Sequence, residues 1–150
     1  MSASIRNLVA ELTIKADAER VRDASMWLAQ SGTEFGVPEE ELNRLDLCLN
    51  EALANIISHG NPAALTCPIH ILLDVRREND ACEATATVSD AGPAFDTSSA
   101  TIKPRPQTLA DAEPGGLGLL MIRSFSDKLA YSYSHGRNHL SFSVRWIETR

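Results

Sequence analysis

The spacing of apolar residues predicts five strands. Five stretches alternate between apolar and polar side chains, which is typical of strands with one buried face. They are residues 8–14, 69–76, 84–89, 129–134 and 139–146. The polar tripeptide Glu78-Asn79-Asp80 and the pair Gly136-Arg137 are expected to turn two hairpins, each of which joins neighbouring strands.

Two longer segments carry apolar residues at helical spacing. The first is expected to begin with Asp17 as its N-cap and to run to about Gln30, before Ser31-Gly32. The second is expected to start at Pro38, to carry acidic residues in its first turn and to end near Ser58. Gly60 is its stop signal.

The second helix has an apolar stripe that is expected to face the core, because its members fall on one side at 100° per residue. The stripe consists of Leu42, Leu45, Leu49, Leu53 and Ile56. A shorter helix is expected over residues 116–125, after a proline-rich loop at 93–115 that we interpret as a lid. Strands in antiparallel pairs with helices between them predict an α+β, two-layer sandwich with a mixed, mainly antiparallel sheet, forming one domain over residues 1–150.

Composition narrows the function. The 150 residues carry a net charge of −6 and no more than two consecutive basic residues, so no nucleic-acid partner is expected. No apolar run approaches the roughly 20 residues of a membrane span, so no membrane association is expected. Three scattered cysteines without a CxxC pair suit free thiols in a reducing cytoplasm, and the four histidines form no ligand cluster for zinc.

Glu51 and Asn55 lie one turn apart, almost opposite the core stripe. Leu47, Cys48 and Ala54 share that side, which indicates the wall of a pocket; the alternative is an ordinary solvated surface. An Asn side-chain oxygen is a hard neutral ligand for Mg²⁺, and a Glu one turn earlier could accept a proton.

Two further motifs contain glycines: one after Asp90 and one at residues 115–118. Asp90 ends an apolar stretch and Gly92 follows; the carboxylate could accept from the amine of a base, and the alternative is a plain turn. Phe95 could pack beneath that turn or serve the core. Residues 115–118 read Gly-Gly-Leu-Gly before a helix and indicate a phosphate cradle or, alternatively, a hinge.

These segments together resemble the GHKL (Bergerat-fold) ATPases, and within them the RsbW-type anti-sigma factor/serine-protein kinases. Residues 51–60 resemble the N-box, 90–96 the G1 box and 115–124, followed by Asp127, the G2 box. Residues 136–141 resemble the closing strand of the family. One departure is Thr97, where family members often carry proline after the G1 box.

The resemblance implies a role for each matching residue. Glu51 would be the general base and Asn55 would bind Mg²⁺. Asp90 would read the adenine amino group, with Gly92 beneath the ring. The remaining nucleotide contacts would come from Phe95 beneath the turn, the phosphate-binding residues Gly116, Leu117 and Gly118, and Ser141 in the adenine pocket. ATP and Mg²⁺ are the implied cofactors.

The function implied is that of a cytoplasmic serine/threonine-protein kinase that also sequesters a partner. It would phosphorylate a STAS-domain antagonist and hold a sigma factor or similar regulator, and a homodimer is expected. The alternative is a nucleotide-dependent protein-binding switch without phosphoryl transfer. A sensor-kinase ATPase fragment is disfavoured, because the chain begins at Met1 with its own first strand and shows no dimerisation helix with a phosphorylatable histidine.

Overall fold

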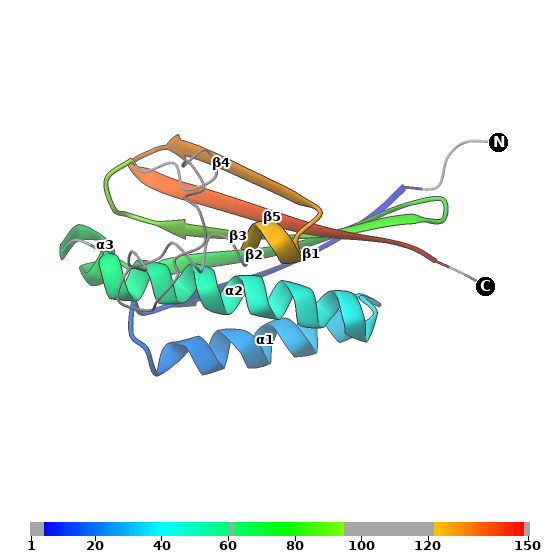
Figure 1. Cartoon of the computed structure of the whole chain (residues 1–150), viewed down its shortest axis with the longest axis horizontal. Coiled ribbons are helices and arrows are strands. Elements are labelled where there is room, and N and C mark those ends of the chain that lie inside the picture. The colour runs from blue at the N-terminus through cyan, green and yellow to red at the C-terminus, as the bar shows by residue number, and fades with distance from the viewer. Residues whose placement is uncertain (1–4, 61, 95–121, 149–150) are drawn as a thin grey trace, which may run out of the picture.

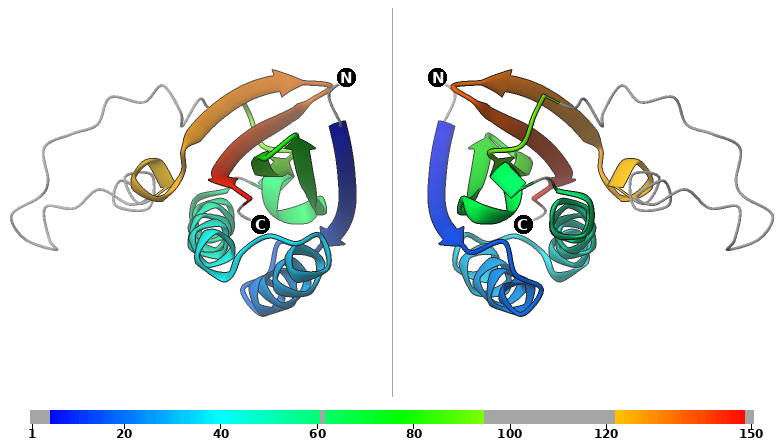
Figure 2. Two further views of the ribbon diagram at one scale, coloured as in Figure 1. Left: turned by 90° about the vertical axis from the view of Figure 1, so that its right-hand side faces the viewer. Right: turned by 90° about the vertical axis from the view of Figure 1, so that its left-hand side faces the viewer.

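One antiparallel sheet carries all the described helices on the same face (Figures 1 and 2). The computed structural model describes residues 5–60, 62–94 and 122–148. The strands are β1 (Ile5–Ile14), β2 (Ile69–Glu78), β3 (Ala81–Asp90), β4 (Lys128–Ser134) and β5 (Arg137–Ile147). The helices are α1 (Arg20–Glu34), α2 (Glu39–His59) and α3 (Pro62–Thr66), and residues 122–125 are also helical.

The sheet order is β1-β2-β3-β5-β4, and every pair of neighbours is antiparallel. The two predicted hairpins are present: Asn79 turns the first with φ of 56°, and His135 and Gly136 turn the second with φ of 53° and 74°. The α+β two-layer fold is therefore confirmed. The expected mixed sheet is antiparallel throughout its described pairs, because two helices return the chain from β1 to the start of β2.

The core lies between α2 and the inner side of the sheet. The predicted stripe of α2 is confirmed, because Leu45, Leu49 and Leu53 are fully buried and Ile56 packs at the margin. Alternate residues of β2, β3 and β5 supply the other half of the core. The inner residues of β5 are Asn138, Leu140, Phe142, Val144 and Trp146.

The ends of α1 differ from the prediction. The helix continues through Ser31 and Gly32 to Glu34, because Gly32 lies against α2 and a Cβ there would stand 2.4 Å from a methyl carbon of Leu42. Gly36, with φ of 81°, follows the helix instead. The N-cap residue is Glu19 and not the predicted Asp17. The Asp17 carboxylate does accept a hydrogen bond of 3.0 Å from the N–H of Glu19.

The other boundaries are close to expectation. Pro38 is the residue before the first turn of α2, and Gly60 follows its last residue, as predicted. The five-residue α3 is not predicted, because a helix of about one and a half turns is too short to show a periodic spacing of apolar residues. Of the expected lid, only residues 93 and 94 belong to the described part of the chain, and of the expected third helix only residues 122–125 do.

Asp127 joins the short helix at residues 122–125 to both layers. Its carboxylate accepts from a guanidinium nitrogen of Arg44 at 3.1 Å and from the backbone N–H of Arg145 at 2.7 Å. Arg44 also donates through Nε to the carbonyl of Phe125 at 2.9 Å. Burial raises the pKa of Asp127, but the hydrogen bond from Arg145 and the Arg44 guanidinium outweigh it, so the pKa lies below its usual value.

Two leucines of α2 test the core assignment. Replacing the fully buried Leu49 with Ala is expected to lower the free energy of unfolding by about 2–5 kcal/mol through lost burial and a cavity. Leu47→Ala is the matched control, because Leu47 is 41% exposed two residues away on the same helix. Urea unfolding of both variants measures the difference; equal losses would contradict the assignment.

The Asp127 junction predicts a pH dependence. Because its pKa is depressed in the folded chain, the carboxylate adds stability above its unfolded value near 3.8, and this contribution disappears as the pH falls through the folded value. Asp127→Asn is therefore expected to be less stable than wild type at pH 7, and the two should converge as the pH falls below the depressed pKa of the folded chain. Chemical unfolding from pH 7 downward tests this; a difference that stays constant with pH would refute it.

Candidate functional site

Glu51 and Asn55 lie on one side of helix α2, in line with Cys48, which contacts the short helix at residues 122–125. Cys48, one turn before Glu51, is buried, and its Sγ lies 3.8 Å from the carbonyl oxygen of Ile122. Glu51 and Asn55 follow along the same side and are half-buried. Leu47 and Ala54 are exposed, so the covered wall of α2 consists of Cys48, Glu51 and Asn55.

The Cys48 thiol is not the reactive group of this wall. Burial raises its pKa to about 11, and the charge of Glu51 adds to the rise while that of Arg44 opposes it. The thiol is therefore protonated at neutral pH and is a weak nucleophile. Glu51 is the carboxylate on this side of α2.

The turn after β3 is closed by the side chain of Asp90. Its Oδ1 accepts a hydrogen bond of 2.8 Å from the N–H of Gly92. Gly92 is buried, and a Cβ there would stand 2.8 Å from the same Oδ1 and 3.3 Å from the Cβ of Ala64 in α3. Only glycine fits without displacing either the carboxylate or α3, so the glycine predicted at this turn has a steric reason.

Asn138 faces Asp90 across the sheet, and sequence reasoning missed it. The two residues are partners in the register of β3 and β5. The buried Asn138 amide donates through Nδ2 to the carbonyls of Pro93 at 2.8 Å and Gly92 at 3.2 Å, and to Asp90 Oδ1 at 3.3 Å. A polar residue on the otherwise apolar inner row of β5 was the available signal, but only the register shows what it faces.

These contacts leave one carboxylate oxygen of Asp90 available. Oδ1 receives two donors, while Oδ2 has no hydrogen-bond partner among the residues that the structure describes. An ionised carboxylate only accepts hydrogen bonds. Oδ2 of the half-buried Asp90 is therefore suited to a donor such as the exocyclic amine of a purine.

The Asp90 turn and the C-terminal part of α2 lie at the same end of the molecule (Figure 1). Contacts connect them: a Cβ on Gly60, just after α2, would stand 3.0 Å from Ala64, whose own Cβ faces Gly92. Both Asp90 and the wall of α2 belong to the space between helices and sheet. The structure thus brings Asp90 and Gly92 close to the C-terminal end of α2, the helix that carries Glu51 and Asn55.

Ser141 does not lie beside Asp90 and Gly92 on the helix side of the sheet. Its hydroxyl pairs at 2.8 Å with that of Thr87, next to an identical pair between Thr85 and Ser143. These four hydroxyls lie on the side of the sheet away from the helices, because alternate residues of a strand face opposite sides and Leu140 and Phe142 point inward. The predicted Phe95, Gly116, Leu117 and Gly118 lie outside the described residues.

Comparison with known proteins gives a family. The model of the histidine kinase-like ATPase domain matches residues 14–144. The serine/threonine-protein kinase BtrW of Bordetella bronchiseptica is 35% identical over 136 residues, which are 88% of this chain and 90% of that protein.

A solved structure shares the fold. The RsbU and RsbW domains of Rv1364c from Mycobacterium tuberculosis match with a TM-score of 0.63 and 14% identity over 94% of this chain. The chain spans 34% of the length of that structure. Since the family model covers most of the sequence and the relative covers nearly all of it, the chain belongs to the histidine kinase-like ATPase family, the GHKL family that its motifs resemble.

Proposed function

We propose that this chain is an ATP-dependent serine/threonine-protein kinase of the RsbW type. The observation that carries the proposal is the fixed Asp90 carboxylate, whose Oδ2 has no hydrogen-bond partner among the described residues, near the C-terminal end of the helix that carries Glu51 and Asn55. The likeness to the kinase BtrW supports phosphoryl transfer as the reaction.

Adenine fits the Asp90 turn. Its 6-amino group would donate to Oδ2 of the carboxylate, whose Oδ1 is held by the Gly92 N–H and the Asn138 amide. Guanine carries an oxygen acceptor at that position, which the carboxylate would repel. The turn therefore favours ATP over GTP.

The wall of α2 supplies the groups for transfer. Asn55 would hold Mg²⁺ through its side-chain oxygen, and Mg·ATP would supply the γ-phosphoryl group and the neutralising charge. Glu51 would accept the proton of the attacking hydroxyl as its oxygen bonds to phosphorus and ADP leaves. Glu51 is half-buried and reachable from solvent, as this role requires.

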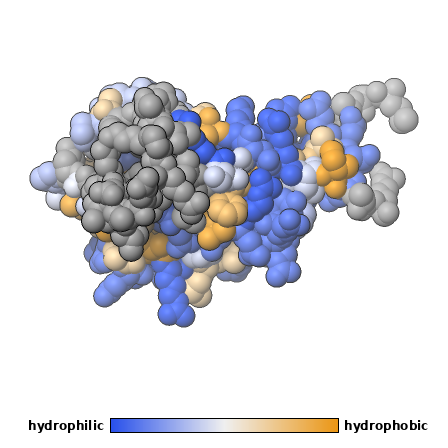
Figure 3. All heavy atoms as spheres, viewed as in Figure 1, coloured by the Kyte–Doolittle hydropathy of each residue, from blue (hydrophilic) through white to orange (hydrophobic). Residues whose placement is uncertain are grey.

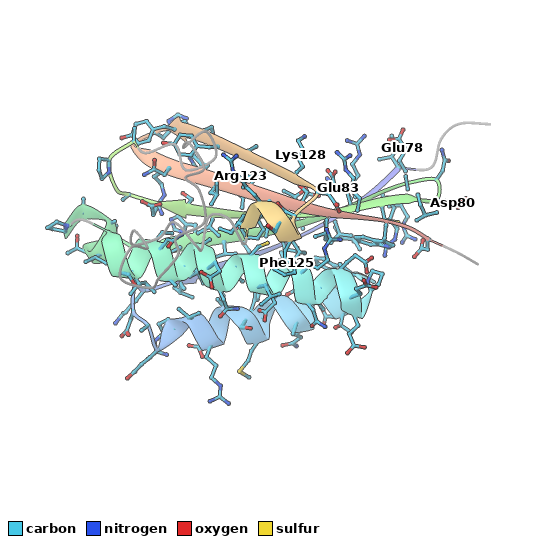
Figure 4. All side chains as sticks on the ribbon, in the orientation of Figure 1. Glu78, Asp80, Glu83, Arg123, Phe125 and Lys128 are labelled. Atoms are coloured by element: carbon cyan, nitrogen blue, oxygen red, sulfur yellow. The ribbon has the colours of Figure 1, made fainter. Side chains whose placement is uncertain are left out.

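A protein is the proposed phosphoryl acceptor. Leu47 and Phe125 are exposed apolar side chains: Leu47 lies one turn before Glu51 on α2, and the carbonyl of Phe125 accepts a hydrogen bond from Arg44 of the same helix. Figure 3 shows an apolar spot on a largely hydrophilic face, and Figure 4 labels Phe125 between the short helix and α2. Exposed apolar groups of this kind are typical of protein contacts.

The proposal includes partners and location. The acceptor would be the serine or threonine of a STAS-domain antagonist, and a sigma factor or similar regulator would be the protein held in its absence. A homodimer is included because β1 is a ten-residue edge strand, a form that pairs readily with a second chain. None of the described helices is long and apolar enough to cross a membrane. A cytoplasmic location is proposed because ATP is the substrate.

Replacing Asp90 with Asn tests the adenine site. In the variant the side-chain oxygen must stay on the side of Gly92 and Asn138, so an NH₂ group would face the base amine and repel it. In wild type, Mg·ADP at a hundred times its Kd is expected to add about 2.7 kcal/mol, a shift in Tm of about 5–11 °C. The shift should disappear in Asp90→Asn.

The control for this test is Asp74→Asn, on the β2 side that faces away from the helices. It should keep the wild-type shift. A full shift in Asp90→Asn would contradict the assignment of Asp90, and no shift in wild type would contradict nucleotide binding.

Glu51→Gln separates a kinase from a nucleotide-dependent binding switch. The amide cannot accept the hydroxyl proton, so transfer of phosphate from ATP to the cognate STAS-domain protein should fall at least 100-fold, within the usual range for a general base. Affinity for ADP should stay within about twofold. Phosphate incorporation is measured by mass spectrometry, with Glu40→Gln in the exposed first turn of α2 as the control.

Two outcomes would count against the kinase. Equal phosphorylation by Glu51→Gln and wild type would contradict Glu51 as the base. No transfer by wild type, together with nucleotide-dependent partner release, would favour the binding switch.

A further inference from the structure

We infer that Asn138 and Tyr131 are positioning residues that fix which oxygen of Asp90 reads the base, and so set the preference for adenine. The inference rests on the adenine site of the proposed function. Its evidence is a set of hydrogen bonds that runs from β4, through the inner row of β5, to the turn after β3.

The Asn138 amide has one orientation that suits its surroundings. Three acceptors face its Nδ2: the carbonyls of Gly92 and Pro93, and Asp90 Oδ1. With the amide reversed, its oxygen would face all three acceptors and repel each of them. The three contacts hold the backbone of the turn and one carboxylate oxygen to the same NH₂ group.

Tyr131 secures this orientation from the other side. Its hydroxyl donates to Asn138 Oδ1 at 2.5 Å and so holds the amide in the orientation that the three acceptors around Nδ2 select. Tyr131 is half-buried, whereas its strand β4 is otherwise mostly exposed. Tyr131, on the edge strand β4, therefore acts on the position of Asp90 through the Asn138 amide.

The consequence concerns specificity. Gly92 N–H and Asn138 Nδ2 both bind Oδ1, so the carboxylate cannot turn Oδ1 toward the ligand without losing them. Oδ2, which has no hydrogen-bond partner among the described residues, stays the oxygen that can accept from the base. If the amide loosens, Asp90 gains rotational freedom, which weakens binding of a base with a 6-amino group more than binding of one with a 6-oxo group.

Tyr131→Phe tests the inference with little change in packing, because it removes only the hydroxyl. We expect the Kd for ADP to rise about three- to tenfold, in keeping with the loss of one buried hydrogen bond. The Kd for GDP should change less than twofold, so the ratio of the two constants should shrink. Isothermal titration with each nucleotide gives both constants.

Tyr133→Phe is the matched control. Tyr133 is the same residue type two positions along β4, is 47% exposed, and has no described hydrogen bond through its hydroxyl. It should bind both nucleotides as wild type does. A merely structural effect of Tyr131→Phe would weaken ADP and GDP equally and would overturn the inference, as would an unchanged Kd for ADP.

A second variant tests the amide itself. Asn138→Asp places a carboxylate against Asp90 and the carbonyls of Gly92 and Pro93, so ADP binding at pH 8 should fall further than in Tyr131→Phe. Thermal melts without ligand confirm that each variant folds, and Tyr131→Phe decides the matter if Asn138→Asp does not. If wild type itself binds no ADP, the adenine site and this inference fall together; if wild type binds and Tyr131→Phe matches it, the inference alone fails.

Discussion

The pairing of β3 with β5 is the interaction on which the described site depends. It sets Asp90 opposite Asn138, and it places the turn after β3 within reach of the buried amide. A slip of one residue in this register would move every inner side chain to the outer face. The fully buried Phe142 and Val144 on the same strand oppose such a slip, because it would expose them to water. Core packing and site geometry are therefore fixed by one set of backbone hydrogen bonds.

Helix α2 connects that core to the proposed chemistry. One side of the helix is buried in the sheet through Leu45, Leu49 and Leu53, and this burial leaves little freedom to rotate. Glu51 and Asn55 consequently keep a fixed direction, on the same side of α2 as Cys48, whose Sγ lies 3.8 Å from the carbonyl oxygen of Ile122. Arg44 and Asp127 add a polar connection between α2, the short helix and β5. These contacts hold the described base of the α2 wall in place.

Much of this architecture could be predicted from the sequence, and the failures have physical causes. The strands and the apolar stripe of α2 follow from periodicity, since burial of one face imposes it. The prediction that α1 ends before Ser31-Gly32 is wrong. The sequence alone does not distinguish a glycine that is needed for close contact with Leu42 from one that is needed for a turn. The roles of Asn138 and Ser141 depend on which side of the sheet each residue faces. That side is fixed only by the register in which β5 pairs with β3. Asp90 could be predicted because it ends its strand, but its two oxygens could not be distinguished before the partners of Oδ1 were known.

The central claim is that a fixed Asp90 oxygen accepts a hydrogen bond from the 6-amino group of adenine. The most direct measurement compares the affinity of wild type for ADP and for inosine diphosphate, which differ at this position of the base and keep the same sugar and phosphates. We predict that inosine diphosphate binds at least about tenfold more weakly, because its 6-oxo group meets a carboxylate that can only accept. Equal affinity for the two nucleotides would contradict the account.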